Sequence, residues 1–549
     1  MSQEILLPVI LGLVFLLIKF VGFSKQTGKP IPGPPALPLV GNLLQFKSPS
    51  ILKTWARQYG EIYQVRLGPA QNWVFLNSPR IVKELLEKKS AATSTRPSFL
   101  SANMVSGGRR MVLMPYGNHW RTLRSIIHAS LTPKAANVLQ PAQNFEGKQL
   151  IWDIFNSISN PGKTQEAKDD REMGFYTHVQ RYSASVILLM VYGLRAPTWE
   201  SNAITQIYKV MNDFGKVANP MYGAIDIFPW LLNLPNWMHW WNSDLKKIEE
   251  RQSEAWLRYW NQMKDKIDKG EAPDCFGRQF VEAGYRQKGI SELQAAYVCG
   301  TMIEAGSDTT AASVNNGLLY LSAYPDVVAR AHEEIERVVG NSRSPTFDDD
   351  LPYVRAIVKE TLRIRPATTM GGPHAADQDI EYNGYIIPKG TGLMLHQNGI
   401  QMDPDIYPEP EKFNPDRFLD HPLKAGDYVG IADPYKRDHW TYGTGRRICS
   451  GMHVAENSLH IVFAKILWAY TISAPKDDGG KLLPVDLSDD AFVLGAVTVA
   501  KPYRCIFSPR NAQVAETIAG EWKEAEREGF QLGDRKVGID GIIASVQTN

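Results

Sequence analysis

Apolar residues recur every three or four positions along most of the chain, and this spacing is typical of amphipathic helices. The clearest run covers residues 452–470, and a second long run begins near Glu292 and ends near Tyr324. Shorter helices are predicted over residues 48–59, 81–89 and 351–364, and over most of 150–300. The pattern therefore predicts a mainly helical protein.

Alternation of apolar and polar residues, which indicates strands, is confined to short stretches. Residues 63–67 predict one strand and residues 73–76 a second. Residues 372–387 are strand-like, and residues 491–498 predict a hairpin whose tip, near Leu494 and Gly495, reaches the pocket of the protein. The fold class is thus mainly α with a small β region.

Two stretches show neither the helical nor the strand spacing of apolar residues. Residues 98–114 are apolar but irregular, with two glycines and two arginines at 107–110, which suits a loop that lines a pocket. Residues 401–440 carry scattered prolines and charges and are expected to form an irregular meander.

The N-terminal residues 1–28 are predicted to be a membrane anchor. Residues 5–23 are apolar apart from Lys19, and as a helix of about 1.5 Å per residue they nearly span a bilayer core. A cleaved signal peptide is the alternative, but Glu4 precedes the apolar run and no small-residue cleavage site follows. The lysines after the run place the following residues on the cytoplasmic side.

The rest of the chain divides into three parts. Residues 29–45 form a proline-rich hinge, because proline stiffens the chain and prevents a helix. Residues 46–510 contain no linker or repeat and are predicted to be one catalytic domain. Residues 511–549 are a charged C-terminal extension with a helix over 512–528, for which the sequence suggests no function.

Composition excludes several function classes. The chain has 549 residues, 44% of them hydrophobic, and a net charge of +2, so nothing implies nucleic acid as a partner. Its four cysteines are far apart, which favours neither a disulfide framework nor a zinc site and fits a reducing compartment.

One of these cysteines lies in a loop with unusual chemistry. Residues 440–451 form a loop with three glycines and two arginines, and they place Cys449 just before a predicted helix. Backbone amides, the helix N-terminus and the arginines all favour a thiolate there, and glycines let a flat ring approach the backbone. Without further signals, a buried structural cysteine would be the simpler interpretation.

Five positions of this loop decide between these interpretations. Tyr442, Gly445, Arg447, Cys449 and Gly451 match the pattern Phe-x-x-Gly-x-Arg-x-Cys-x-Gly of the cytochrome P-450 family, with tyrosine in place of phenylalanine. The chain resembles this family, and its microsomal fungal members most closely. The resemblance implies that Cys449 is the axial ligand of haem b and that Arg447 contacts a haem propionate, with Gly445 beside the cofactor.

Two further motifs complete the predicted cofactor site. Trp120 and Arg124 share one helix face, which by itself favours a surface cation–π pair. The resemblance makes them the family's other propionate-holding helix. His374 alone would be a surface residue, and the resemblance implies that it bonds the second propionate.

The long helix contains the stretch Ala-Gly-Ser-Asp-Thr-Thr at 305–310, whose glycine and hydroxyls weaken a helix. It matches the family's oxygen-binding sequence. The resemblance implies that Thr309 supports dioxygen and that Asp308 helps to deliver protons.

Glu360 and Arg363 lie one turn apart on the helix at 351–364, where a solvated ion pair is the ordinary interpretation. They match the family's Glu-x-x-Arg motif. The resemblance implies that Arg417 joins them in a structural triad that clamps the Cys449 loop from behind.

A tryptophan-rich stretch at 228–241 is either core or an interfacial membrane belt, and the sequence leaves both open.

Together these features predict a haem-thiolate monooxygenase that inserts one atom of O₂ into an apolar small molecule, in fungal secondary metabolism. Electrons would come from NADPH through a separate cytochrome P-450 reductase, because no dinucleotide-binding fingerprint is present. The expected location is the endoplasmic reticulum membrane, in contact with lipid. A haem-thiolate isomerase or dehydratase is the alternative enzyme, disfavoured by the Asp308-Thr309 pair. A haem-binding sensor is the non-enzymatic alternative.

Overall fold

The computed structural model describes residues 28–38, 40–45, 50–159, 173–218, 223–477, 479–541 and 543–545. The predicted anchor at 5–23 lies outside these residues. Among the described residues, no helix is both long enough and apolar enough to cross a membrane.

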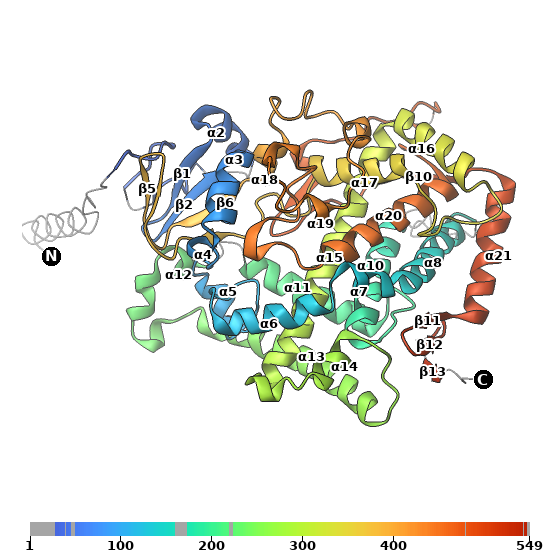
Figure 1. Cartoon of the computed structure of the whole chain (residues 1–549), viewed down its shortest axis with the longest axis horizontal. Coiled ribbons are helices and arrows are strands. Elements are labelled where there is room, and N and C mark those ends of the chain that lie inside the picture. The colour runs from blue at the N-terminus through green and yellow to red at the C-terminus, as the bar shows by residue number, and fades with distance from the viewer. Residues whose placement is uncertain are drawn as a thin grey trace, which may run out of the picture.

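Helices make up most of the molecule (Figure 1). The longest is α15 (Glu292–Ala323), which Ser291 caps by accepting the amide of Gln294 and which ends before Pro325. The other helices are α2 (Ile51–Tyr59), α3 (Pro79–Val82), α4 (Ser90–Thr93), α5 (Leu100–Met104), α6 (Asn118–Ala129), α7 (Pro133–Val138), α8 (Gln140–Ser159), α10 (Phe175–Tyr192), α11 (Asn202–Val217), α12 (Ala224–Ile227), α13 (Asn242–Asp268), α14 (Phe276–Glu282), α16 (Pro325–Val338), α17 (Pro352–Ile364), α18 (Gln397–Gln401), α19 (Ala425–Tyr428), α20 (Met452–Ala469) and α21 (Ala512–Glu528).

The strands form five small sheets. The largest has the order β1-β2-β6-β3, in which β2 and β6 are parallel and the other neighbours antiparallel. The remaining sheets are β10-β7, β11-β12-β13, β4-β5 and β8-β9. Their bounds are β1 (Ile62–Leu67), β2 (Gln71–Leu76), β3 (His374–Ala375), β4 (Ile380–Tyr382), β5 (Tyr385–Ile387), β6 (Gly392–Leu395), β7 (Tyr470–Ser473), β8 (Phe492–Leu494), β9 (Thr498–Ala500), β10 (Ile506–Pro509), β11 (Phe530–Leu532), β12 (Arg535–Val537) and β13 (Ile543–Ser545).

Helix α15 runs through the centre of the molecule and packs against α10, α13, α17 and α20. Its contact with α10 is close at Gly306, where an added Cβ would lie 2.6 Å from the side chain of Ile187. The Ser183 hydroxyl donates to the Gly306 carbonyl at 3.1 Å. The glycine in this helix therefore serves the packing of two helices.

The helices and strands agree with the sequence pattern at the long elements. α15, α17 and α20 begin and end within about two residues of their predicted bounds, and the hairpin β8-β9 is present. The helix predicted over 81–89 is instead α3 followed by a π-helical stretch, Lys83–Lys88. Residues 401–440 form the expected meander, and residues 98–114 contain the short helix α5.

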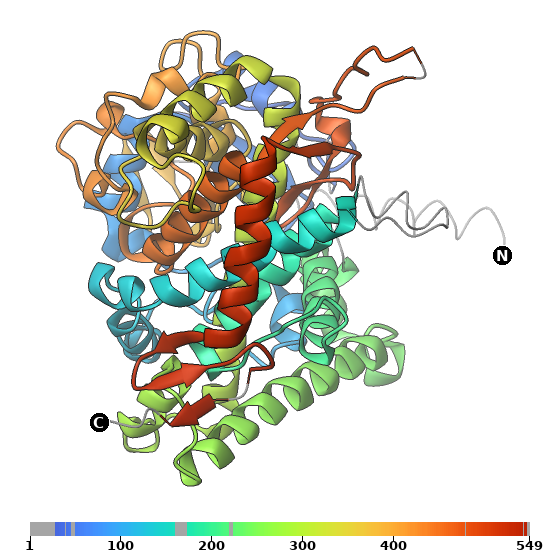
Figure 2. The ribbon, with the colours of Figure 1, turned by 90° about the vertical axis from the view of Figure 1, so that its right-hand side faces the viewer.

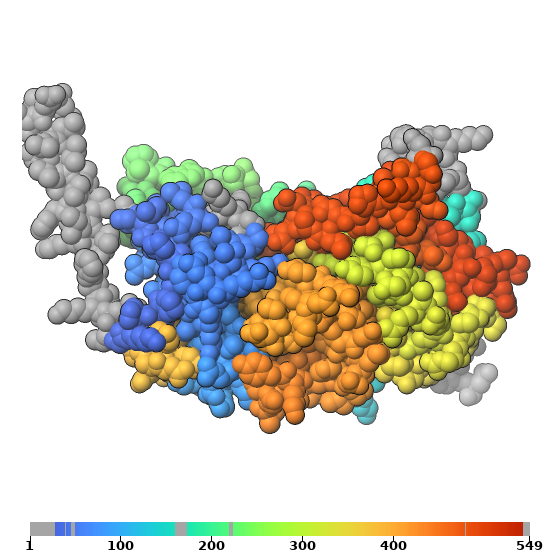
Figure 3. Space-filling model, turned by 90° about the horizontal axis from the view of Figure 1, so that it is seen from above, coloured from blue at the N-terminus to red at the C-terminus, as the bar shows by residue number. Residues whose placement is uncertain are grey.

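The proline-rich segment is docked on the body. The Gln64 amide donates to the Pro32 carbonyl at 2.8 Å, and Asn42 accepts the Arg66 amide at 2.9 Å. The side chain of Ile31 is buried. Viewed from above, the blue N-terminal region lies beside the orange meander (Figure 3), where Lys83 donates to the Ile431 carbonyl at 2.5 Å.

The C-terminal extension covers one side of the catalytic body (Figure 2). α21 packs on α8, and Trp522 and Phe530 contact the ring of Phe145 with centroid distances of 5.6 and 4.7 Å. Glu521 accepts hydrogen bonds from the amide and hydroxyl of Ser344. The charged outer surface of this helix was expected, but its buried apolar face joins the main core of the protein.

Candidate functional site

The Cys449 loop lies between a 3-10 turn, Gly445–Arg447, and the start of α20. The Cys449 amide donates to the Tyr442 carbonyl at 2.8 Å, which fixes the loop. The protein surrounds Cys449 on all sides, yet its surface is accessible, so the thiol borders an internal space. Burial raises the pKa of the Cys449 thiol more than the Gly451 amide and Arg124 lower it. The Gly451 amide and Arg124 thus act toward the thiolate, as expected, and burial opposes them.

The three loop glycines differ in what they do. An added Cβ at Gly443 or Gly451 would meet open space. At Gly445, with φ +62, it would lie 2.2 Å from the Leu86 carbonyl oxygen. Gly445 is therefore required by a contact within the protein, and its predicted contact with a cofactor stays a prediction.

Arg447 and Arg124 approach the loop from two sides. Arg447 donates to the backbone carbonyls of Ser94 at 2.7 Å and Met114 at 2.6 Å, and its guanidinium lies 4.0 Å from the ring centroid of Trp120. Arg124, on α6, donates to the Ile448 carbonyl. The structure thus brings together Trp120, Arg124, Arg447 and Cys449, which are far apart in sequence.

A third arginine at this site was missed by the sequence analysis. Arg96 donates to the carbonyls of Val112 at 2.8 Å, Gly372 at 2.9 Å and Pro373. Burial, Arg96 and Arg124 together lower the pKa of Arg447 to about 9. No carboxylate of the described residues pairs with these three side chains, which we call the arginine cluster (Arg96, Arg124, Arg447). Arg96 lies outside any helix or strand and belongs to no motif, so the sequence pattern did not indicate it.

His374 lies beside the cluster on β3. It is buried, its Nδ1 lies 2.9 Å from the Thr93 carbonyl oxygen, and burial with nearby Arg96 lowers its pKa to about 3. The alternative of a surface histidine is therefore wrong. With Nδ1–H used for Thr93, the neutral ring offers only an acceptor at Nε2, so its predicted bond to a propionate requires a second proton.

Asp308 and Thr309 lie on α15, three and four residues after Ala305. Ala305 is exposed although it lies in the middle of the central helix. The Thr309 hydroxyl donates to the Ala305 carbonyl at 2.7 Å, which is the helix-weakening bond expected from its sequence. Burial raises the pKa of Asp308 to about 6.

The predicted triad is assembled behind the loop. Glu360 and Arg363 have no exposed side-chain surface, and Arg363 donates to both carboxylate oxygens, at 2.6 and 2.7 Å. Arg417 adds a contact of 3.4 Å to Glu360. The ordinary interpretation, a solvated surface pair, is wrong because the helix face that carries it is covered by the meander.

Comparison with known proteins decides the family. The model of the family described as Cytochrome P450 matches residues 31–497. The chain belongs to the cytochrome P450 family. The chain is 38% identical over 534 residues to cytochrome P450 monooxygenase verL of Clonostachys rogersoniana, covering 96% of this chain and 95% of the relative. It is 36% identical to cytochrome P450 monooxygenase pgmC of Aspergillus terreus, covering 98% and 96%. This P450 is accordingly an oxidoreductase of the monooxygenase class.

The residues of this P450 fit the family's haem. A macrocycle with two carboxylates needs one soft axial donor and cations at one edge. Cys449 supplies an accessible sulfur inside the molecule, and the arginine cluster supplies three guanidiniums that lack carboxylate partners among the described residues.

Gln401 is a second residue that the sequence analysis missed. Its side-chain oxygen accepts the amide of Trp440 at 2.6 Å, while its backbone carbonyl accepts Arg363 at 2.8 Å. It therefore connects the triad to the start of the Cys449 loop. A glutamine in a five-residue helix carries no motif that could have indicated this role.

Tyr442, the one departure from the family pattern, is buried, and its ring lies 5.4 Å from that of His439. Among the described residues, its hydroxyl has no hydrogen-bond partner. The ring is buried, and its added hydroxyl has lost water without gaining a hydrogen bond within the described residues.

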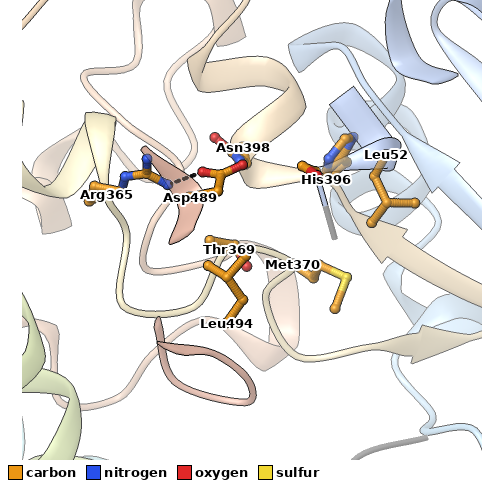
Figure 4. Close-up of a pocket in the computed structure, with 9 residues that line it drawn as sticks. Leu52, Arg365, Thr369, Met370, His396, Asn398, Asp489 and Leu494 are labelled. Atoms are coloured by element: carbon orange, nitrogen blue, oxygen red, sulfur yellow. Dashed lines mark hydrogen bonds and ion pairs between the residues drawn. The ribbon is translucent and has the colours of Figure 1, made fainter. Parts of the chain in front are cut away.

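The hairpin tip lies at a small cavity away from the cysteine (Figure 4). Leu494 lines it together with Thr369, Met370 and His396, and Arg365 pairs with Asp489 at its rim at 2.6 Å. Its lining includes none of the predicted site residues. The predicted reach of the hairpin tip to the substrate pocket stays a prediction.

The tryptophan-rich stretch is mostly on the surface. Trp230, Trp237 and Trp240 are 55%, 83% and 64% exposed. A core role for these three is excluded, and the interfacial interpretation stays a prediction.

Proposed function

We propose that this P450 inserts one atom of O₂ into an apolar small molecule, with electrons from NADPH delivered by a separate cytochrome P-450 reductase. The observation that carries the proposal is an accessible thiol, Cys449, that the protein surrounds and that lies beside the arginine cluster. As family members, P450 monooxygenases use O₂, a substrate and a redox partner.

Haem b is the proposed cofactor. Cys449 would ligate its iron, and Arg447, Arg124, Trp120 and Arg96 would hold its carboxylates. His374 would join them only with both ring nitrogens protonated. When bound, the haem binds and reduces dioxygen, and its thiolate ligand pushes electron density that favours O–O cleavage.

The protein's own residues would manage protons beside the cofactor. The Thr309 hydroxyl both donates and accepts, and it is already oriented by the Ala305 carbonyl. Asp308 has a pKa of about 6, close to the operating pH, so its carboxyl can take up and release a proton during turnover.

The cellular setting is also a proposal. The apolar residues 5–23 and the exposed tryptophans at 230, 237 and 240 support attachment to the endoplasmic reticulum membrane, with the body on the cytoplasmic side. The proposed role lies in fungal secondary metabolism, and the two relatives, which are monooxygenases of fungi, fit it.

The proton function is tested with Thr309→Ala, and Thr309→Ser is the matched control because it keeps the hydroxyl. We expect NADPH consumption to continue in Thr309→Ala while product per NADPH falls and hydrogen peroxide rises. Loss of a positioned proton-transfer group typically slows the assisted step about 10²–10⁴-fold.

An unchanged ratio of product to NADPH in Thr309→Ala would remove Thr309 from the mechanism. Product formed without any NADPH or reductase would instead support the isomerase alternative.

A further inference from the structure

Arg110 is a fully buried arginine in the irregular segment 105–114, outside the catalytic residues described above. Its side chain has no exposed surface, whereas an arginine in a loop is normally solvated. Burial of a permanent charge is costly unless partners surround it, so its contacts identify what the segment is held to.

Three neighbouring elements supply these contacts. Arg110 forms a bidentate pair with Glu304 of α15, with an Nε–Oε2 distance of 2.9 Å, and donates to Gln252 of α13 at 2.8 Å. Its guanidinium also lies 3.7 Å from the ring centroid of Phe214 on α11. α5, α11, α13 and α15 pack together in this part of the molecule (Figure 1).

The segment reaches from this anchor to the cofactor edge. Glu304 directly precedes Ala305, the exposed residue of α15 beside Thr309. On the other side of Arg110, the carbonyls of Met111 and Met114 accept hydrogen bonds from Arg447. The segment is therefore held at two points, by Glu304 on the helix and by Arg447 of the arginine cluster.

We propose that Arg110 is a positioning residue that latches segment 105–114 onto α15 and thereby limits the size of the molecules that reach the haem. This inference rests on the proposed function, because it takes segment 105–114 to border the space for the substrate. Because both carboxylate oxygens of Glu304 are occupied by Arg110, opening the segment requires breaking two charge-assisted hydrogen bonds together.

The neighbouring arginine provides a matched control. Arg109 pairs with Glu249 at 3.2 Å, and both side chains are more than a quarter exposed. Such a solvated pair contributes little to holding a loop. Arg109→Leu therefore changes charge and sequence at the adjacent position without releasing the latch.

The experiment measures binding of two haem ligands of different size, imidazole and clotrimazole, by the shift of the haem absorption band. The test variant is Arg110→Leu/Glu304→Leu, because an apolar pair leaves no buried charge behind and should preserve folding. We expect clotrimazole to associate about tenfold faster or more, as loss of a charge-assisted bidentate pair would allow. Imidazole affinity should remain as in the wild type, and Arg109→Leu should match the wild type for both ligands.

Equal clotrimazole association rates in the wild type and the double variant would overturn the latch. If the double variant fails to load haem, Arg110→Lys decides, since it keeps the charge but loses the bidentate fork. Faster association of clotrimazole in Arg110→Lys supports the latch, and a wild-type rate overturns it. Failure of the proposed function is separate, because it would appear as absence of NADPH-dependent product in an enzyme that binds imidazole normally.

Discussion

Tyr442 shows how one residue can depart from a family pattern at a cost in stability. Its ring fills the position of the expected phenylalanine, but the buried hydroxyl finds no partner among the described residues. An unpaired buried hydroxyl costs free energy, because it loses water without gaining a hydrogen bond.

We therefore expect Tyr442→Phe to leave the free energy of unfolding unchanged or to raise it by about 1 kcal/mol. Tyr407→Phe is the matched comparison, since the Tyr407 hydroxyl donates to the Asp438 carbonyl at 2.9 Å, and it should lower that free energy by a similar amount. Denaturant unfolding of the haem-loaded variants measures both. A loss in Tyr442→Phe as large as in Tyr407→Phe would mean that the hydroxyl has a partner.

Asp308 gives a prediction about pH. Burial raises its folded-state pKa to about 6, so the folded protein binds this proton more tightly than the unfolded chain does. The associated stability is present at low pH and is lost as the pH rises through about 6. Asp308→Asn cannot ionise, and we expect it to gain about 1–2 kcal/mol on the wild type between pH 5 and pH 8.

Unfolding titrations at the two pH values measure this difference. The exposed Asp420 serves as the control position, and Asp420→Asn should follow the wild type at both. A parallel pH dependence of Asp308→Asn and wild type would show that the carboxyl ionises as it does in solution.

At the scale of elements, helix α17 carries the strongest coupling between the fold and the site. The Glu360–Arg363 pair on this helix is fully buried. The backbone carbonyl of Gln401 accepts a hydrogen bond from Arg363, and its side-chain oxygen accepts one from the Trp440 amide. The helix therefore positions the Cys449 loop through side chains that never touch the cysteine.

Arg363→Ala is expected to lower the free energy of unfolding by about 3–5 kcal/mol, because Glu360 would remain as a buried charge with only Arg417 nearby. The purified variant should contain little haem. Arg330→Ala is the control, since Arg330 and Asp416 form an exposed pair, 47% and 46%, and it should cost under about 1 kcal/mol. Equal haem content in the two variants would contradict the role of the triad.

The long elements were predictable from sequence because their signals are local. α15 and α20 have regular apolar spacing, and α17 starts at Pro352 and ends just before Pro366, so each helix is specified by its own residues. Arg96, Gln401 and Arg110 were not predictable as site residues, because each acts through residues more than 100 positions away or through backbone carbonyls. The burial of Glu360 was also hidden, since it depends on how the meander folds over α17.

At the scale of the whole molecule, the C-terminal extension completes the core. Trp522 is 4% exposed and packs on Phe145 of α8, while Arg195 donates to the carbonyl of Ile539. The main core therefore includes residues beyond the end of the family match at residue 497.

Trp522→Ala is expected to lower the free energy of unfolding by about 3–5 kcal/mol, as removal of a large buried aromatic side chain usually does. Lys523→Ala, at the exposed neighbouring position, should change it by less than about 0.5 kcal/mol. Thermal or denaturant unfolding compares the two. A similar small effect for both would mean that α21 is only loosely attached to α8.

Because α21 covers α8, the apolar surface of α8 is made long before the helix that buries it. The ribosome completes α8 at Ser159 and must add the rest of the catalytic body before Ala512 is made. At about 5–20 residues per second, the apolar surface around Phe145 waits roughly 20–70 s for its cover. During that interval the uncovered apolar surface is open to association with other chains, and we expect a product truncated before α21 to aggregate or be degraded.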